Sequence, residues 1–349
     1  MRYYTCARKT KFNAHADEEF VFDVGVTAAG LLVASGSDRS LRVFDAATLV
    51  PIAAIPDVHT KISGLRVKGS EAYTSGEDGS VKMLDVRSGG IVSLVHGAQN
   101  PPWLCLDVDG PTVAAGSELK GSDAVLALWD TRQSGQRVFS ECHTEDVTQV
   151  ALQSSPLRVL SGGQDGLMTL LDPSLGEEED CVLQVFNHTS SLAHCGFLNE
   201  RYVYGISHME TMGVYNTDAE EEGSTPFHDL GDLRSSLGCD YVAGFIASST
   251  GHAVITGSFS EPVAHVLEFD VDTMQMDRTR GVQLIGAHQS ELLRCGVLLD
   301  DQLIITGGED NEIRAWRHDE TIQGSKGSNS ARIRRKSKGL EEAARFQPY

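Results

Sequence analysis

Short apolar runs, each bounded by glycine- or serine-rich turns, recur along the 349-residue chain. The runs at 31–34, 41–44, 81–84 and 303–305 are either continuously apolar or alternate between apolar and polar positions. Runs of this length with turn residues beside them predict β-strands. Helical periodicity extends over no long segment, and only one helical turn is predicted, near 340–344. The pattern therefore indicates an all-β fold.

The ends of these runs reveal an internal repeat. An apolar or aromatic residue followed by Asp, or by a residue in its place, ends a run at Phe44-Asp45, Leu84-Asp85, Trp129-Asp130, Leu171-Asp172, Tyr215-Asn216, Phe269-Asp270 and Trp316-Arg317. Successive pairs are 40 to 54 residues apart, mostly close to the roughly 40–45-residue period of a four-stranded propeller blade. Seven copies predict a seven-bladed β-propeller over residues 1–317.

Two further features keep step with this repeat. Six residues before the first member of the pair, five copies have an Asp in or after a Gly/Ser-rich turn: Asp38, Asp78, Asp123, Asp165 and Asp310. Four copies have a His 19 to 23 residues before that Asp: His15, His59, His143 and His288. Three features in register over four or five copies make a strong repeat signal.

These residues resemble the WD40-repeat family, and the resemblance covers residues 1–317. It implies that His, Ser or Thr, Asp and Trp form a buried hydrogen-bonded network, which we call a staple, inside a blade. Blade seven has the complete set, His288, Thr306, Asp310 and Trp316. Blades two and four have Leu84 and Leu171 in place of Trp, together with His59, Thr74 and Asp78, and with His143, Ser161 and Asp165. Because these His–Asp pairs recur, we interpret them as structural rather than catalytic.

Blades five and six depart from the pattern, and blade seven lacks one strand. Met209 and Val263 stand where blades five and six should have the turn Asp, so we expect weak staples there. Blade seven provides only three strands before residue 317. We predict that the N-terminal segment 2–8 supplies its fourth strand and closes the ring, which removes exposed edges. Residues 318–349 are predicted to form a flexible basic tail.

The net charge of −20 is unevenly distributed. Residues 318–349 contain seven Lys/Arg and four Asp/Glu, so residues 1–317 carry −23. With the strands of a blade named a to d, the c–d loops of blades four, five and six contain Glu177, Glu178, Glu179 and Asp180; Glu220, Glu221 and Glu222; and Asp270, Asp272 and Asp277. These loops form either a solvated cluster or a docking patch for a basic protein. The acidic body argues against direct, sequence-independent binding of nucleic acid.

Two aromatic residues and one arginine are further candidates for partner contacts. Trp103 begins blade three, where it is either an exposed anchor or packs between blades. Phe259 lies in the b–c loop of blade six. Arg132 completes Trp129-Asp130-Thr131-Arg132, which is similar to the W-D-x-R form of WD-repeat substrate receptors in cullin-based ubiquitin ligases. The primary prediction is a non-enzymatic interaction scaffold or escort, and the alternative is such a receptor.

Composition and missing motifs complete the expectations. Seven scattered cysteines without a C-x-x-C pair suit a reducing compartment. No membrane span or signal-peptide core is evident, and the basic run 331–338 is typical of a nuclear import signal. We expect a nuclear and cytoplasmic protein that binds other proteins but no membrane, and that is a monomer outside its complex. The sequence carries no phosphate-loop, dinucleotide or zinc-protease motif, so no cofactor, metal or catalytic site is predicted.

Overall fold

The computed structural model describes residues 1–16, 18–95, 100–122, 124–132, 135–218, 227–248, 251–288, 291–300 and 302–320. Residues Met1–Asp319 form one compact unit. The predicted tail therefore lies, except for its first three residues, outside the described part of the chain, and its flexibility remains a prediction. No helix among the described residues is long and apolar enough to cross a membrane.

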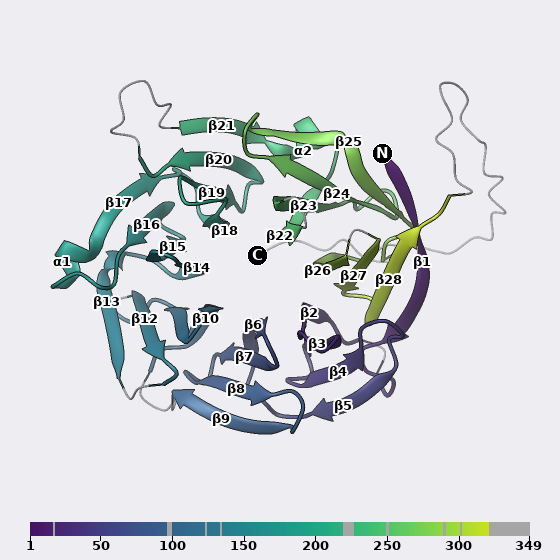
Figure 1. Cartoon of the computed structure of the whole chain (residues 1–349), viewed down its shortest axis with the longest axis horizontal. Helices are drawn as coiled ribbons and strands as arrows, with labels where there is room; N and C mark the ends of the chain where they lie inside the picture. Colours follow the sequence, from purple (N-terminus) through teal and green to yellow (C-terminus); the bar gives the residue numbers. More distant parts are fainter. Residues whose placement is uncertain are drawn as a thin grey trace, which may run out of the picture. The chain divides into compact units, whose positions relative to one another are not determined.

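Four-stranded antiparallel blades follow one another around an axis, with strand a innermost and strand d outermost (Figure 1). Blade one comprises β2 (Val21–Val26), β3 (Leu31–Gly36), β4 (Leu41–Asp45) and β5 (Pro51–Ile55). Blade two comprises β6 (Ile62–Lys68), β7 (Glu71–Gly76), β8 (Val81–Asp85) and β9 (Gly90–Val95). Blade three comprises β10 (Trp103–Asp109), β11 (Thr112–Ser117), β12 (Ala124–Asp130) and β13 (Gln136–His143).

The remaining blades contain the two short helices. Blade four comprises β14 (Val147–Ser154), β15 (Leu157–Gly163), β16 (Leu167–Leu171), α1 (Glu178–Cys181) and β17 (Val182–Asn187). Blade five comprises β18 (Leu192–Phe197), β19 (Tyr202–Ser207), β20 (Thr211–Asn216) and β21 (Phe227–Asp232), and α2 (Leu233–Leu237) follows it. Blade six comprises β22 (Tyr241–Ser248), β23 (Gly251–Gly257), β24 (Val263–Asp270) and β25 (Gln275–Ile285). Asp277 thus lies on β25 and not in the c–d loop.

The N-terminal strand closes the ring, as predicted. Blade seven consists of β26 (Leu293–Asp300), β27 (Leu303–Gly308), β28 (Glu312–His318) and, as its outer strand, β1 (Arg2–Lys11). β1 pairs antiparallel with β28, with Cys6 opposite Trp316. It also pairs in parallel with β25, with Arg2 opposite Val282. Blades six and seven therefore share one eight-stranded sheet, a link that the sequence pattern did not predict.

Burial explains why the middle strands read as continuous apolar runs. In β3, β7, β11 and β19 every residue after the first is buried. Each of these strands packs against neighbouring blades on both faces, so both of its faces require apolar side chains. The outer strand β5, in contrast, is exposed at four of its five positions. The hydrophobic core is thus divided into clusters between adjacent blades, such as the one that joins Leu32 and Phe44 of blade one to Ile305 of blade seven.

Candidate interaction surfaces

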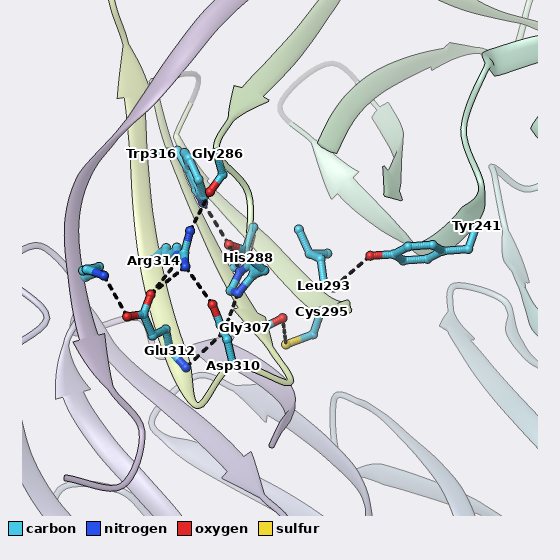
Figure 2. A network of polar contacts seen from close by, with 12 residues as sticks. Tyr241, Gly286, His288, Leu293, Cys295, Gly307, Asp310, Glu312, Arg314 and Trp316 are labelled. Atoms are coloured by element: carbon cyan, nitrogen blue, oxygen red, sulfur yellow. Dashed lines mark hydrogen bonds and ion pairs between the residues drawn. The ribbon is translucent and has the colours of Figure 1, made fainter. Parts of the chain in front are cut away.

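The blade-seven staple is a complete chain of hydrogen bonds (Figure 2). His288 Nδ1 lies 2.7 Å from Asp310 Oδ1, and His288 Nε2 lies 2.8 Å from Thr306 Oγ1. Trp316 Nε1 donates to the same Thr306 oxygen at 2.8 Å. The side chains of His288, Thr306 and Trp316 are fully buried. A neutral histidine that donates from Nδ1 and accepts at Nε2 satisfies every member of this chain.

Arg314 adds a charge to the same network. Its guanidinium donates to Asp310 Oδ2 at 2.7 Å and to the carbonyl of Gly286 at 2.6 Å. Burial by itself raises the pKa of Asp310, but the hydrogen bond from His288 and the positive charge of Arg314 lower this pKa below its ordinary value. The carboxylate is therefore ionised and fully engaged with its neighbours. The His–Asp pair serves the fold and leaves no group free to act on a substrate.

Blades two and four repeat this geometry without the tryptophan. His59 lies 2.9 Å from Asp78 and 2.8 Å from Thr74, and His143 lies 3.1 Å from Asp165 and 2.8 Å from Ser161. A glycine at the end of strand b makes room for the ring. A Cβ atom added to Gly76 would lie 2.4 Å from the ring of His59, and one added to Gly308 would lie equally close to His288. This close approach accounts for the Gly-rich turn in the sequence repeat.

In blade one a phenylalanine takes the place of the histidine. The interpretation of His15 as the repeat histidine is wrong, because His15 is exposed. The ring that lies over Gly36 is that of Phe12, which is 2% exposed. Asp38 accepts instead from Nδ2 of Asn13 at 3.1 Å. In blade three, Asp123 lies outside the described residues.

Blade five retains a staple that the repeat pattern did not reveal. His188 Nδ1 lies 2.9 Å from the hydroxyl of Tyr215, and its Nε2 lies 3.3 Å from Thr211 Oγ1. His188 precedes Tyr215 by 27 residues, whereas His288 precedes Trp316 by 28. That spacing is the signal that identifies His188, because the turn Asp that marks the histidine in other blades is absent here.

Trp103 is a core residue and not an exposed anchor. It is 1% exposed, and its Nε1 donates to the carbonyl of Gly79 at 2.9 Å. Its ring meets that of Trp129 edge-on at 5.4 Å. Of the two interpretations that the sequence allowed, the structure therefore shows packing between blades two and three.

The acidic loop of blade four lies along the outer strand of blade three. Arg137 of β13 donates to the carbonyl of Leu175 at 2.7 Å, and Glu178 accepts from the backbone N–H of Glu141, also at 2.7 Å. Figure 1 shows α1 at the outer margin of the ring beside β13. Glu178 is half-buried and holds the loop in place, whereas the flanking acids Glu177, Glu179 and Asp180 are exposed. Glu220, Glu221 and Glu222 lie outside the described residues.

The other two candidates are exposed. Phe259 is 65% exposed in the turn between β23 and β24, and its ring lies against that of Tyr241, with centroids 5.1 Å apart and planes tilted by 37°. The side chain of Arg132 is 68% exposed. It forms a fork with the carboxylate of Asp130, with contacts of 3.0 Å from Nε and 2.9 Å from Nη2. Among the described residues, no group of His, Cys, Asp and Glu side chains has the arrangement of a metal site.

Comparisons with known proteins agree with this architecture. The family described as "WD domain, G-beta repeat" matches residues 6–45. An uncharacterised WD repeat-containing protein of Saccharomyces cerevisiae is 28% identical over 295 residues, which cover 81% of this chain and 74% of the relative. An uncharacterised WD repeat-containing protein of Schizosaccharomyces pombe is 28% identical over 324 residues, which cover 87% and 97%.

A third relative agrees with a similarity that can be read from particular segments of the sequence. Residues 143–150, 161–166 and 286–310, together with the divergent fifth blade, are similar to WD repeat-containing protein 89. The WD repeat-containing protein 89 homolog of Dictyostelium discoideum is 25% identical over 321 residues, which cover 88% of this chain and 85% of the relative. WD-repeat domains generally serve as scaffolds for protein–protein interaction. The seven blades, their staples and these similarities all agree with a WD-repeat β-propeller.

Proposed function

We propose that this protein is a non-enzymatic scaffold or escort that holds a basic protein at the acidic loop beside blade three, in the nucleus and cytoplasm. Support comes from the WD40-repeat family, whose members generally act as interaction scaffolds. The formal charge of −20 gives the chain a long-range attraction for cationic partners. The His and Asp side chains that resemble catalytic pairs are hydrogen-bonded within the staples.

One observation carries the proposal. The carboxylates of Glu177, Glu179 and Asp180 are exposed, and no ion pair neutralises them among the residues that the structure describes. Arg137 and Glu178 fix the loop that presents them. Like charges held close together repel, and a segment rich in lysine or arginine relieves that repulsion when it binds.

Charge reversal tests this proposal. The full chain, the triple variant Glu177→Lys, Glu179→Lys, Asp180→Lys and a control are immobilised, and bound proteins are quantified by mass spectrometry at increasing salt. The control has the same change in net charge on exposed acids elsewhere: Glu118→Lys, Glu145→Lys and Glu291→Lys. We expect salt-sensitive recovery of a basic protein by the wild type and the control, and its loss in the triple variant. Equal loss in both variants contradicts a local docking site.

The exposed Arg132 supports a second candidate function, that of a ubiquitin-ligase substrate receptor. Arg132→Ala removes the guanidinium while Asp130 still accepts the backbone N–H of residue 132 at 2.9 Å. Recovery of a cullin adaptor by the wild type, and its disappearance in this variant, favours the receptor. Recovery of a basic protein that is indifferent to Arg132 favours the scaffold.

A further inference from the structure

The two most exposed large apolar side chains of the described residues occupy neighbouring turns. Phe259 is 65% exposed in the b–c turn of blade six, and Met209 is 59% exposed in the b–c turn of blade five. Both blades lack the turn Asp of the repeat. Because strand direction alternates within each blade, all b–c turns emerge on the same face. Two large apolar side chains exposed on one face make that face a candidate contact surface.

Fixed contacts hold the Phe259 turn in position. The Asp240 carboxylate accepts from Ser258 Oγ and from the backbone N–H of Phe259, both at 2.7 Å. The Phe259 ring rests on Tyr241, whose hydroxyl accepts from the backbone N–H of Leu293 at 2.8 Å. Figure 2 shows this hydroxyl pointing toward Leu293 of blade seven. The phenyl ring is thus presented in a preformed position, which lowers the entropy lost on binding.

Glu210 connects the two turns. Its carbonyl accepts from the N–H of Leu233 at 2.9 Å, and its carboxylate accepts from the N–H of Val242 at 3.1 Å. Met209 directly precedes Glu210, and Tyr241, which carries the Phe259 ring, directly precedes Val242. Met209 and Phe259 therefore lie on the same face, in turns of adjacent blades that Glu210 links through its hydrogen bonds. We call Met209, Glu210, Asp240, Phe259 and Glu261 the turn patch.

The turn patch carries uncompensated negative charge. Within the described residues, Glu210, Asp240 and Glu261 have no ion-pair partner. Two nearby arginines are already engaged, Arg234 with Asp232 at 2.8 Å and Arg294 with Glu309. A third, Arg278, lies beside Gly238, and among the described residues it forms no ion pair with Glu210, Asp240 or Glu261. A binding partner therefore gains most from a positive charge close to an apolar group. The same charge repels nucleic acid and anionic lipid.

We propose that the turn patch binds a protein segment in which an apolar side chain stands next to lysine or arginine. The apolar side chain packs against Phe259 and Met209, and the cation approaches the carboxylates that surround them. The site lies on blades five and six, away from the acidic loop of blade four. A test of the turn patch is therefore independent of a test of the function proposed above.

Peptide selection tests the site and requires no identified partner. A random peptide library displayed on phage is selected on the immobilised full chain, and the enriched peptides are titrated by fluorescence anisotropy. The variants are Phe259→Ser with Met209→Ser, and, as a matched control, Ile52→Ser, which removes a side chain that is 55% exposed on the outer strand of blade one. We expect enriched peptides with an apolar residue beside Lys or Arg, bound at least about tenfold more weakly by the double variant and equally well by the control.

Two further variants separate the apolar contribution from the charge. Glu261→Lys should weaken binding and reduce its salt dependence, whereas Phe259→Leu should retain most of the affinity. Met209, Phe259 and Glu261 are all exposed, so variants at these positions should have the same melting temperature as the wild type. The proposal is overturned if the library enriches nothing on the wild type over the double variant, if enriched peptides lack basic residues, or if the double variant binds them with unchanged affinity.

Discussion

The staple can be tested by making the same change, threonine to valine, at two buried threonines in neighbouring blades. We expect the change to lower stability at one position and not at the other. Thr306 of blade seven and Thr256 of blade six both directly precede a glycine in strand b, and both are fully buried. Thr306 Oγ1 contacts His288 Nε2 and accepts from Trp316 Nε1, each at 2.8 Å. Thr256 Oγ1 has no hydrogen-bond partner among the described residues. Valine replaces either hydroxyl by a methyl group of similar size.

The expected free-energy changes follow from the hydrogen bonds. Thr306→Val leaves the indole N–H and the imidazole Nε2 buried without partners, and each such group costs about 1–3 kcal/mol. The variant should therefore lose about 2–6 kcal/mol of the free energy of unfolding. Thr256→Val removes a hydroxyl that is already unsatisfied, so it should be neutral or should stabilise the protein by up to about 1 kcal/mol.

Thermal and urea unfolding, followed by tryptophan fluorescence and circular dichroism, measure both variants against the wild type. Thr306→Val is expected to melt several degrees lower, and Thr256→Val at the same temperature or higher. The double variant Thr306→Val, Trp316→Phe checks the assignment, because the partnerless N–H is then gone and part of the loss should be recovered, less the cost of the smaller ring. If Thr306→Val and Thr256→Val lower the free energy of unfolding equally, the hydrogen-bond explanation is refuted, and the loss must be attributed to packing.

Three further predictions concern closure, packing and pH. Deleting residues 1–12 removes β1 from between β25 and β28, so the whole propeller should melt earlier; an unchanged melting curve contradicts the closure. Trp103→Ala should cost about 3–5 kcal/mol in urea unfolding, whereas a surface tryptophan would change stability by less than about 0.5 kcal/mol. Burial, together with the positive charges of His208 and Arg66, lowers the pKa of His194 to about 4 from 6.5. The unfolded chain therefore takes up a proton first, so stability should fall as pH decreases from about 6.5 to about 4, and His194→Gln should flatten that part of the profile.

The fold was predictable because blade geometry constrains sequence at short range. Each b strand lies between two blades, which requires apolar side chains at consecutive positions, and the glycine at its end leaves space for a ring. These local requirements produced the repeat of seven pairs and the spacing of the turn Asp. The parallel pairing of β1 with β25 was not predictable, because it depends on how the two chain ends meet and not on a local pattern. The position of Phe12 over Gly36 was missed for a similar reason, since a nearby His15 fitted the spacing.

The candidate surfaces were less predictable, because sequence shows which residues a loop contains but not where their side chains lie. Trp103 stands at the start of a blade, and only the position of Trp129 and the Gly79 carbonyl shows that it is enclosed. Glu178 is one of four consecutive acids, yet it caps a backbone N–H of blade three while its neighbours remain exposed. Phe259 was identified as a candidate, but its support by Tyr241 depends on contacts between segments 18 residues apart.

Blade five suggests why the divergent blades expose apolar turns. In blades two, four and seven the turn Asp must point inward to hold the histidine, so the turn cannot change freely. In blade five, His188 is held instead by Tyr215 and Thr211 of β20. The turn at 208–210 is thereby released from this structural requirement, and Met209 can be exposed without the loss of a buried hydrogen bond. A staple built from strand residues thus separates the stability of the blade from the composition of its turn, which leaves the turn free to carry the contacts of a binding surface.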